Sequence, residues 1–144
     1  MTLLEEHRAN LRLSYLMVAH GLAVIGHASD RVAVMYLGRI VEIGDVDQVF
    51  DNPIHPYTRA LLSAIPVPDP EVEAKRHRIM LEGDLPTPVN APKGCGFSSR
   101  CPVFKLLPED KKRRCLEEMP ELTHVEGEDH GYACYFPEAE AATV

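Results

Sequence analysis

The sequence predicts an α/β fold in residues 1–65, followed by a connector and an irregular cysteine-containing C-terminal extension. Residues 13–19 are almost continuously apolar, which is typical of a strand buried on both faces of a parallel sheet. Residues 31–36 and 39–43 have the composition of two further strands. The twelve prolines fall after Asn52, and the four cysteines lie in the last third, so regular structure should be concentrated before the extension.

The first elements follow from apolar spacing. Leucines among charged residues in 1–12 predict an amphipathic helix, which leads into the strand at 13–19. Gly21 interrupts the apolar run, and residues 22–25 begin a short helix. His20 therefore lies where a strand ends and a helix starts, and in open α/β sheets ligands bind at that edge. His27 is interpreted as a surface or packing residue.

The next elements form a sheet margin with two short helices. A turn at Leu37-Gly38 should connect the strands at 31–36 and 39–43. Asp45 is placed to cap a helix that runs to Phe50 and turns its valines inward. Pro56 suits the first turn of another helix, which Pro66 ends.

The remaining chain is poor in periodic apolar residues. Residues 66–78 predict a proline-rich, charged connector, and 79–137 the cysteine-containing extension, with a short strand at 79–81. The basic run 111–114 is interpreted as a solvated helix face, and 138–144 as a flexible tail.

Charge and hydropathy exclude several classes of protein. The net charge of −7 disfavours nucleic-acid binding, which needs a basic face to release counterions from phosphates. The apolar stretch at 13–25 is shorter than the about 20 residues of a membrane span. A secretory signal is the alternative there, but Glu5, Glu6 and His20 argue against it, so a cytosolic chain is expected.

Two stretches resemble a known family. YLMVAHGLAVIGHASDRVAVMYLGRIVEIG at 15–44 and NPIHPYTRALLSAIP at 52–66 resemble the C-terminal part of the ATP-binding subunit of dipeptide and oligopeptide ABC importers. The resemblance covers roughly residues 10–137 and departs at Gly21, where the family usually has Asp. It implies that residues 1–65 are a partial P-loop ABC-type nucleotide-binding domain, from the switch-histidine loop onward.

The resemblance implies a role for His20 that needs residues this chain lacks. As the switch histidine of a complete site, His20 would hydrogen-bond the γ-phosphate of ATP and the attacking water; the alternative is a histidine bonded at a strand end without a ligand. The sequence contains no G-x-x-x-x-G-K-[ST] motif, no apolar strand ending in Asp-Glu and no LSGGQ-like segment. ATP and Mg²⁺ are therefore expected only in the complete subunit, and little or no ATPase activity in this chain alone.

The family resemblance also implies partners and a location. Membrane permease subunits and a second ATP-binding subunit are expected, together with a chain supplying the missing N-terminal half, on the cytoplasmic face of the cell membrane. His55, Tyr57 and Arg59 offer a contact surface for a membrane subunit, although a solvated or internally bonded face is favoured. The sheet edge left by missing strands should favour association.

Four cysteines, with the spacing C-x5-C-x13-C-x18-C, are the candidate ligands of a metal or cluster: Cys95, Cys101, Cys115 and Cys134. A segment that buries little apolar surface needs a metal or crosslinks for stability. Disulfides are disfavoured in the cytosol, and the tight cysteine pairs typical of zinc sites are absent, although His124 and His130 are alternative zinc ligands. An iron-sulfur cluster accepts wider spacing. The alternative to a metal or cluster site is four free thiols that serve as small core residues.

The family resemblance adds to the iron-sulfur interpretation. GCGFSSRCP at 94–102 is similar to the cysteine-containing tail of peptide-importer ATPases, some of which carry a [4Fe-4S] cluster. Gly94 and Gly96 would let backbone amides approach the cluster sulfurs, and Arg100 would offset its charge. A second function follows as an alternative: a non-enzymatic iron-sulfur or zinc-binding module on a remnant transporter scaffold.

Overall fold

The computed structural model describes residues 10–11, 13–19, 22–66, 69, 78–83 and 92–137. His20, Gly21, most of the predicted N-terminal helix, most of the connector and the predicted tail lie outside these residues. Within the part described, no helix combines the length and apolarity needed to cross a membrane.

A β-hairpin lies at the centre of the fold. Strands β1 (Arg31–Tyr36) and β2 (Arg39–Asp45) pair antiparallel, which confirms both predicted strands and extends the second by two residues. Leu37 and Gly38 form the two-residue loop with φ values of 46° and 76°. Positive φ at both loop residues matches the right-handed twist of the strands, and Gly38 adopts it without steric cost.

A β-bulge decides which side chains of β2 face inward. Val34 pairs with Glu42 and Met35 with Ile40, so Val41 is an extra residue on β2. β1 alternates strictly between exposed and buried residues, whereas Val41 and Glu42 are adjacent and both buried. The bulge therefore turns a carboxylate into the interior, where simple alternation would place it outside.

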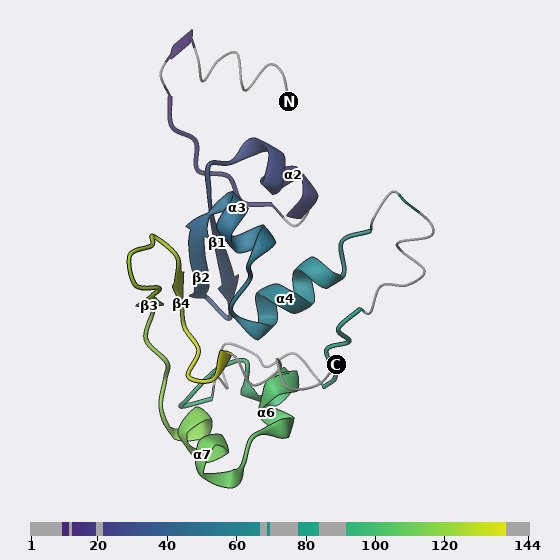
Figure 1. The fold of residues 1–144 in the computed structure, drawn as a ribbon, viewed down its shortest axis with the longest axis vertical. Coiled ribbons are helices and arrows are strands. Elements are labelled where there is room, and N and C mark those ends of the chain that lie inside the picture. Colours follow the sequence, from purple (N-terminus) through teal and green to yellow (C-terminus); the bar gives the residue numbers. More distant parts are fainter. Residues whose placement is uncertain are drawn as a thin grey trace.

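Three short helices accompany the hairpin. They are α2 (Leu22–Ala28), α3 (Val46–Asp51) and α4 (Pro56–Ser63), and Figure 1 shows α3 and α4 following one another beside it. Asp45 is the N-cap of α3, and its backbone N–H donates to Gln48 Oε1 (3.4 Å). Pro56 occupies the first turn of α4, as predicted.

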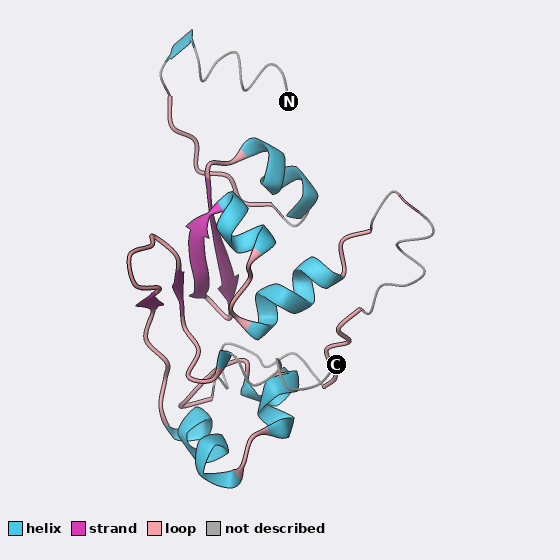
Figure 2. Cartoon of the chain, in the orientation of Figure 1, coloured by secondary structure: helices cyan, strands magenta, loops and turns pink. Residues whose placement is uncertain are grey.

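The C-terminal extension contains short helices and completes the sheet. Its elements are η2 (Ser98–Arg100), α6 (Pro102–Leu106), α7 (Glu109–Glu117), β3 (Thr123–His124) and β4 (Gly131–Tyr132). The strand order is β1-β2-β4-β3, and β4 pairs antiparallel with β2. Figure 2 shows the helices of the extension beyond the end of the sheet that lies away from α2.

Two predicted strands do not form. Residues 13–19 are irregular, and the side chains of Leu16 and Val18 are 98% and 90% exposed. A strand needs at least one hydrogen-bonded neighbour, and no described strand pairs with this run. Residues 79–81 are likewise irregular rather than a strand. The described sheet is wholly antiparallel, so the expectation of a parallel strand is wrong for these residues.

The core joins the hairpin to the extension through one aromatic residue. Its buried members are Val32, Val34, Tyr36, Val41, Val49 and Phe97. Phe97 comes from the extension, is 1% exposed, and lies against Tyr36 and Tyr57 with ring centroids 5.2 Å and 5.3 Å away. Both separations suit edge-to-face or tilted aromatic packing.

Candidate functional site

All four cysteines line one cavity in the extension. Cys95 precedes the turn before η2, Cys101 is the N-cap of α6, Cys115 lies in α7, and Cys134 follows β4. Residues that are up to 39 positions apart in sequence therefore face the same space. None of these four cysteines forms a disulfide bond.

Backbone contacts fix the segments that carry the cysteines. Cys95 N–H donates to Cys115 O (2.7 Å), so the segment before η2 lies directly against α7. A Cβ on Gly94 would lie 2.3 Å from Cys115 O, so any residue other than glycine would clash with the backbone of α7 here. The sequence suggested that Gly94 admits amides to a cluster; the structure instead shows close backbone approach to α7. Ala133 N–H donates to Val41 O (2.8 Å), which ties the segment before Cys134 to β2.

Two cation–π contacts hold α7 against the two aromatic residues that follow Cys134. The Arg114 guanidinium lies 4.1 Å from the ring centroid of Tyr135, and Lys111 Nζ lies 5.1 Å from that of Phe136. Such contacts are worth about 0.5–1 kcal/mol at exposed sites. The basic run 111–114 is otherwise largely exposed on α7, as predicted.

Backbone amides near three of the four sulfurs favour the thiolate form, but by less than burial opposes it. Those of Phe97 and Ser98 act on the pKa of Cys95, those of Phe104 and Val103 on the pKa of Cys101, and that of Phe136 on the pKa of Cys134. Ser98 N–H donates to the backbone oxygen of Cys95 (3.0 Å).

Burial opposes ionisation of these thiols. It raises the pKa of Cys101 and Cys134 to about 12, and it also raises the pKa of Cys95 and Cys115. The Arg59 charge partly offsets this effect on the pKa of Cys134, and Arg114 does so for Cys115. Arg100, which the sequence suggested as the counter-charge, acts instead on the pKa of Tyr57.

A single tetrahedral ion is not supported by this arrangement. Among the described residues, no three His, Cys, Asp or Glu side chains converge as ligands of one metal ion. His130 Nε2 lies 2.8 Å from Glu42 Oε1, and neither it nor His124 is among the described residues that line the cavity. The suggestion that these histidines are zinc ligands is therefore not borne out by their positions.

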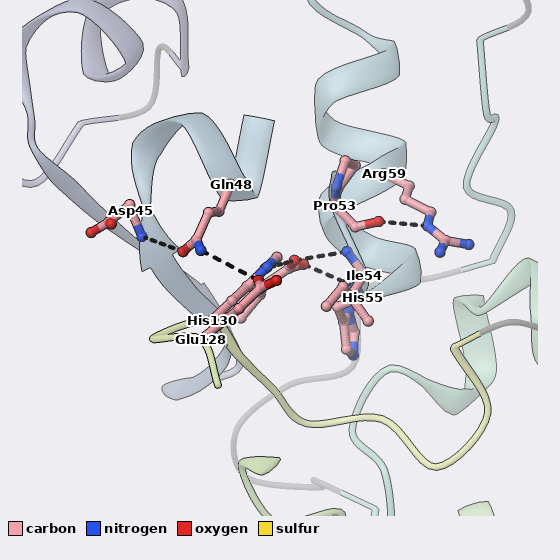
Figure 3. Close-up of polar contacts among 9 residues, drawn as sticks. Asp45, Gln48, Pro53, Ile54, His55, Arg59, Glu128 and His130 are labelled. Carbon is pink, nitrogen blue, oxygen red and sulfur yellow. Dashed lines mark hydrogen bonds and ion pairs between the residues drawn. The ribbon is translucent and has the colours of Figure 1, made fainter. Parts of the chain in front are cut away.

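A buried carboxylate organises the loop beside the cavity. Glu42 is fully buried and accepts hydrogen bonds from Ile54 N–H (2.7 Å) and His55 N–H (2.9 Å). Its third partner is His130, from the segment before β4. Figure 3 shows that His130 lies near Ile54 and His55, at the start of α4. Sequence analysis missed Glu42, because nothing in the local pattern signals the bulge.

His55 is internal rather than a docking residue. It is 1% exposed, caps α4 by accepting Tyr57 N–H at Nδ1 (3.1 Å), and lines the cysteine cavity. Arg59 donates to Pro53 O (2.9 Å, Figure 3) and to Pro137 O (3.1 Å). The internally bonded alternative therefore fits these two residues better than a surface for a membrane subunit.

Comparison with known proteins identifies the same region. Residues 41–105 match the family described as "Oligopeptide/dipeptide transporter, C-terminal region". The oligopeptide transport ATP-binding protein OppF of Escherichia coli is 52% identical over 103 residues, covering 72% of this chain and 31% of that protein. AppF of Bacillus subtilis, also an oligopeptide transport ATP-binding protein, is 44% identical over 135 residues, covering 94% of this chain and 39% of AppF.

The dipeptide transporters give a similar result. The dipeptide transport ATP-binding protein DppF of Escherichia coli is 47% identical over 116 residues, covering 77% of this chain and 34% of DppF. The chain thus spans about a third of the length of the curated relatives it matches. The matched part is their C-terminal region, and by this similarity the chain belongs to the ATP-binding subunits of peptide ABC importers, as a C-terminal portion of such a subunit.

Proposed function

We propose that this chain acts as part of an ATP-binding subunit that couples ATP binding and hydrolysis to the import of dipeptides or oligopeptides. The similarity to OppF, AppF and DppF carries this proposal. The complete subunit would bind ATP and Mg²⁺, pair with a second ATP-binding subunit and dock on membrane permease subunits. It would therefore lie peripherally on the cytoplasmic face of the membrane.

The chain alone should have little or no ATPase activity. Its 144 residues contain no phosphate-binding lysine motif and no Asp-Glu pair at a strand end. His20, proposed as the switch histidine, would act only when another segment supplies these groups. The exposed apolar side chains at 13–18 are consistent with a surface that a complete nucleotide-binding domain covers.

The extension is proposed to hold a [4Fe-4S] cluster on Cys95, Cys101, Cys115 and Cys134. The donor set supports this proposal, since four thiols line one cavity. In a cluster each thiolate binds a different iron, so the sulfurs need not converge as ligands of one ion do. The cavity volume is only about 20 Å³, so seating the cluster core requires the cavity to widen.

The proposed cluster would have a structural or redox-sensing role. When bound, an iron-sulfur cluster supplies one-electron chemistry and crosslinks its ligand segments. The four cysteines would then tie the start of η2, α6, α7 and the segment after β4 to one group. The buried apolar residues of these elements are Phe97, Val103, Leu107 and Ala133, so a crosslink would add stability to a small core.

Metal analysis of the full chain tests the cluster. We expect anaerobic purification, or reconstitution with iron and sulfide, to give a brown protein with about four irons and four sulfides per chain. Cys95→Ser and Cys101→Ser should lose both. A chain that stays colourless and free of iron and sulfide after reconstitution, or that binds stoichiometric zinc instead, would overturn the proposal.

A nucleotide-binding experiment separates the importer from the alternative, a non-enzymatic cysteine-rich module. The four-cysteine cavity is the observation that favours the alternative. The 144-residue chain is mixed with a polypeptide that carries the missing phosphate-binding motifs, and ATP binding is measured by fluorescence. Binding that requires both chains and weakens in His20→Ala supports the importer proposal. Stoichiometric metal binding with no nucleotide response supports the module.

A further inference from the structure

Two of the four cysteines are held next to each other by their backbones. Cys95 N–H donates to Cys115 O (2.7 Å), and among the described backbone contacts this is the only hydrogen bond that joins two cysteines directly. Covalent geometry fixes how far each Cα lies from the bonded N and O atoms, so the two Cα atoms lie within about 6.6 Å of each other. Disulfide bonds span Cα separations of about 4.4–6.8 Å, so this pair meets the distance condition for a disulfide.

The same two residues also face a common space. Cys95 and Cys115 line one cavity of about 20 Å³, so little space separates its walls. Gly94 permits the close approach of their segments, since a Cβ there would clash with the backbone of Cys115 and Leu116. A bond between two sulfurs needs only two partners, whereas among the described residues no three His, Cys, Asp or Glu side chains converge on one point.

The two cysteines differ in how easily a reagent reaches them. Cys95 packs against the main core, whereas Cys115 lies in α7, which buries none of its residues. Burial raises the pKa of both thiols, and the positive charge of Arg114 partly offsets this effect on the pKa of Cys115. Burial raises the pKa of Cys101 and Cys134 to about 12, so these two thiols stay protonated near neutral pH. Cys115 is therefore the thiol that reacts first, with Cys95 behind it.

We propose that Cys95 and Cys115 form a reversible disulfide bond when the metal-free chain meets a low-molecular-weight disulfide such as oxidised glutathione. Cys115 loses its proton to solvent, and its thiolate attacks one sulfur of that disulfide, which breaks the S–S bond and releases one glutathione. Cys95 then loses its proton, and its thiolate attacks Cys115 Sγ and releases the second glutathione. The two thiols thus lose two electrons and two protons, and the glutathione disulfide gains them as two glutathione thiols.

The bond would fasten the extension to itself at one point. It would close residues 95–115 into a loop that contains η2, α6 and most of α7, and that includes the core residue Phe97. It would also occupy two of the four thiols, so a disulfide and a four-cysteine cluster exclude each other. In a reducing compartment such a bond is transient, which is typical of a redox-responsive pair. The pairing depends only on the metal-free chain and not on the proposed cluster.

Peptide mapping of the full chain tests the pairing. The chain is freed of metal with a chelator, reduced, incubated at low protein concentration with oxidised glutathione, alkylated and digested. We expect mass spectrometry to find Cys95 linked to Cys115, with Cys101 and Cys134 alkylated. A predominant bond between any other two cysteines, or no intramolecular bond at all, would overturn the inference.

The same reaction in urea shows whether the fold selects the pair. Loop closure favours cysteines that are close in sequence, so an unfolded chain should preferentially join Cys95 to Cys101, across five intervening residues. We expect native conditions to reverse this preference in favour of Cys115. An identical distribution of bonds in the native and the unfolded chain would show that the backbone contact does not direct the pairing, which contradicts the proposal.

Two double variants give a matched comparison of thiol pairs. Cys101→Ser/Cys134→Ser retains the proposed pair, whereas Cys95→Ser/Cys115→Ser retains the two thiols whose ionisation burial opposes most strongly. We expect the first variant to form its disulfide at least about tenfold faster than the second at the same concentration of oxidised glutathione, because the thiolate is the attacking species. Equal rates would count against the assignment.

A single variant separates the two steps of the reaction. In Cys95→Ser the second attack cannot occur, so we expect Cys115 to retain one glutathione, which mass spectrometry detects as a mixed disulfide. Glutathione retained on Cys101 or Cys134 instead would contradict the order of attack. These results are independent of the proposed function, which is tested by nucleotide binding and by iron and sulfide analysis: a chain that binds no iron could still form the disulfide, and the reverse also holds.

Discussion

The hairpin unit and the cysteine extension are stabilised in different ways. Residues 31–63 supply five of the six buried members of the main core, including Val32, Val34 and Val49. Residues 92–137 supply only Phe97 to that core, and α7 buries no residue. Apolar burial thus dominates the first region. The second combines its own small set of buried apolar residues, Val103, Leu107 and Ala133, with backbone contacts between the cysteine segments and the Glu42 network.

A second contrast concerns two apolar stretches with opposite environments. Val32 and Val34 of β1 are buried, whereas Leu16 and Val18 of the run at 13–19 are almost fully exposed. β1 has a hairpin partner only a few residues away, but a parallel strand depends on partners far away in sequence. Apolar composition therefore predicts burial only where the neighbouring strands are also present.

Truncation of the Phe97 side chain should lower the stability of the fold most, because this residue of the extension packs in the core of the hairpin unit. We expect Phe97→Ala to lower the free energy of unfolding by about 3–5 kcal/mol, the usual cost of removing a buried aromatic ring. Urea denaturation followed by circular dichroism measures this quantity. Leu106→Ala, at an exposed position of α6, is the matched control and should change it by less than about 0.5 kcal/mol. Equal effects would show that Phe97 does not join the regions.

Removal of Glu42 should come next, because it leaves the buried N–H of His55, the partly buried N–H of Ile54 and the ring of His130 without their acceptor. We expect Glu42→Ala to cost about 3 kcal/mol, at about 1–3 kcal/mol for each buried group left unpaired. The same denaturation experiment checks it, with Glu126→Ala as the exposed control. A loss below about 1 kcal/mol would mean that water replaces the carboxylate.

Gly94→Ala should act mainly on the extension. The new Cβ would lie 2.3 Å from Cys115 O, so the segment before η2 must move away from α7 at a cost of about 1–3 kcal/mol. Amide hydrogen exchange should show faster exchange in 92–118 than in β1 and β2. Gly96→Ala is the control, since its Cβ would meet only Leu37 Cδ1 at 3.4 Å. Uniform loss of protection would show that the two regions unfold together.

The smallest effect should come from the ion pair that links β1 to the loop before β4. Arg31 lies 2.9 Å from Asp129, and both side chains are at least half exposed. A double-mutant cycle of Arg31→Ala and Asp129→Ala should give a coupling of about 0.2–1 kcal/mol that decreases in high salt. A coupling that salt leaves unchanged would indicate a contact other than the exposed ion pair.

Local sequence patterns determined the hairpin and the helices next to it. The strands at 31–36 and 39–43, the Leu37-Gly38 turn, the Asp45 cap and the Pro56 helix start were all predictable. Each depends on side-chain periodicity or on a backbone preference that acts within a few residues. The same reasoning gave the cysteines as the candidate ligands, but not their arrangement.

Tertiary structure alone decided the features that depend on distant residues. The bulge that buries Glu42, its contact with His130, and the pairing of β2 with β4 join segments up to 88 positions apart. The convergence of four cysteines on one cavity, with His55 at its wall, has the same origin. The exposed run at 13–19 shows the converse, because its pattern was that of a strand but no described strand pairs with it. Sequence period fixes which residues share a face, whereas only packing of distant segments decides what that face meets.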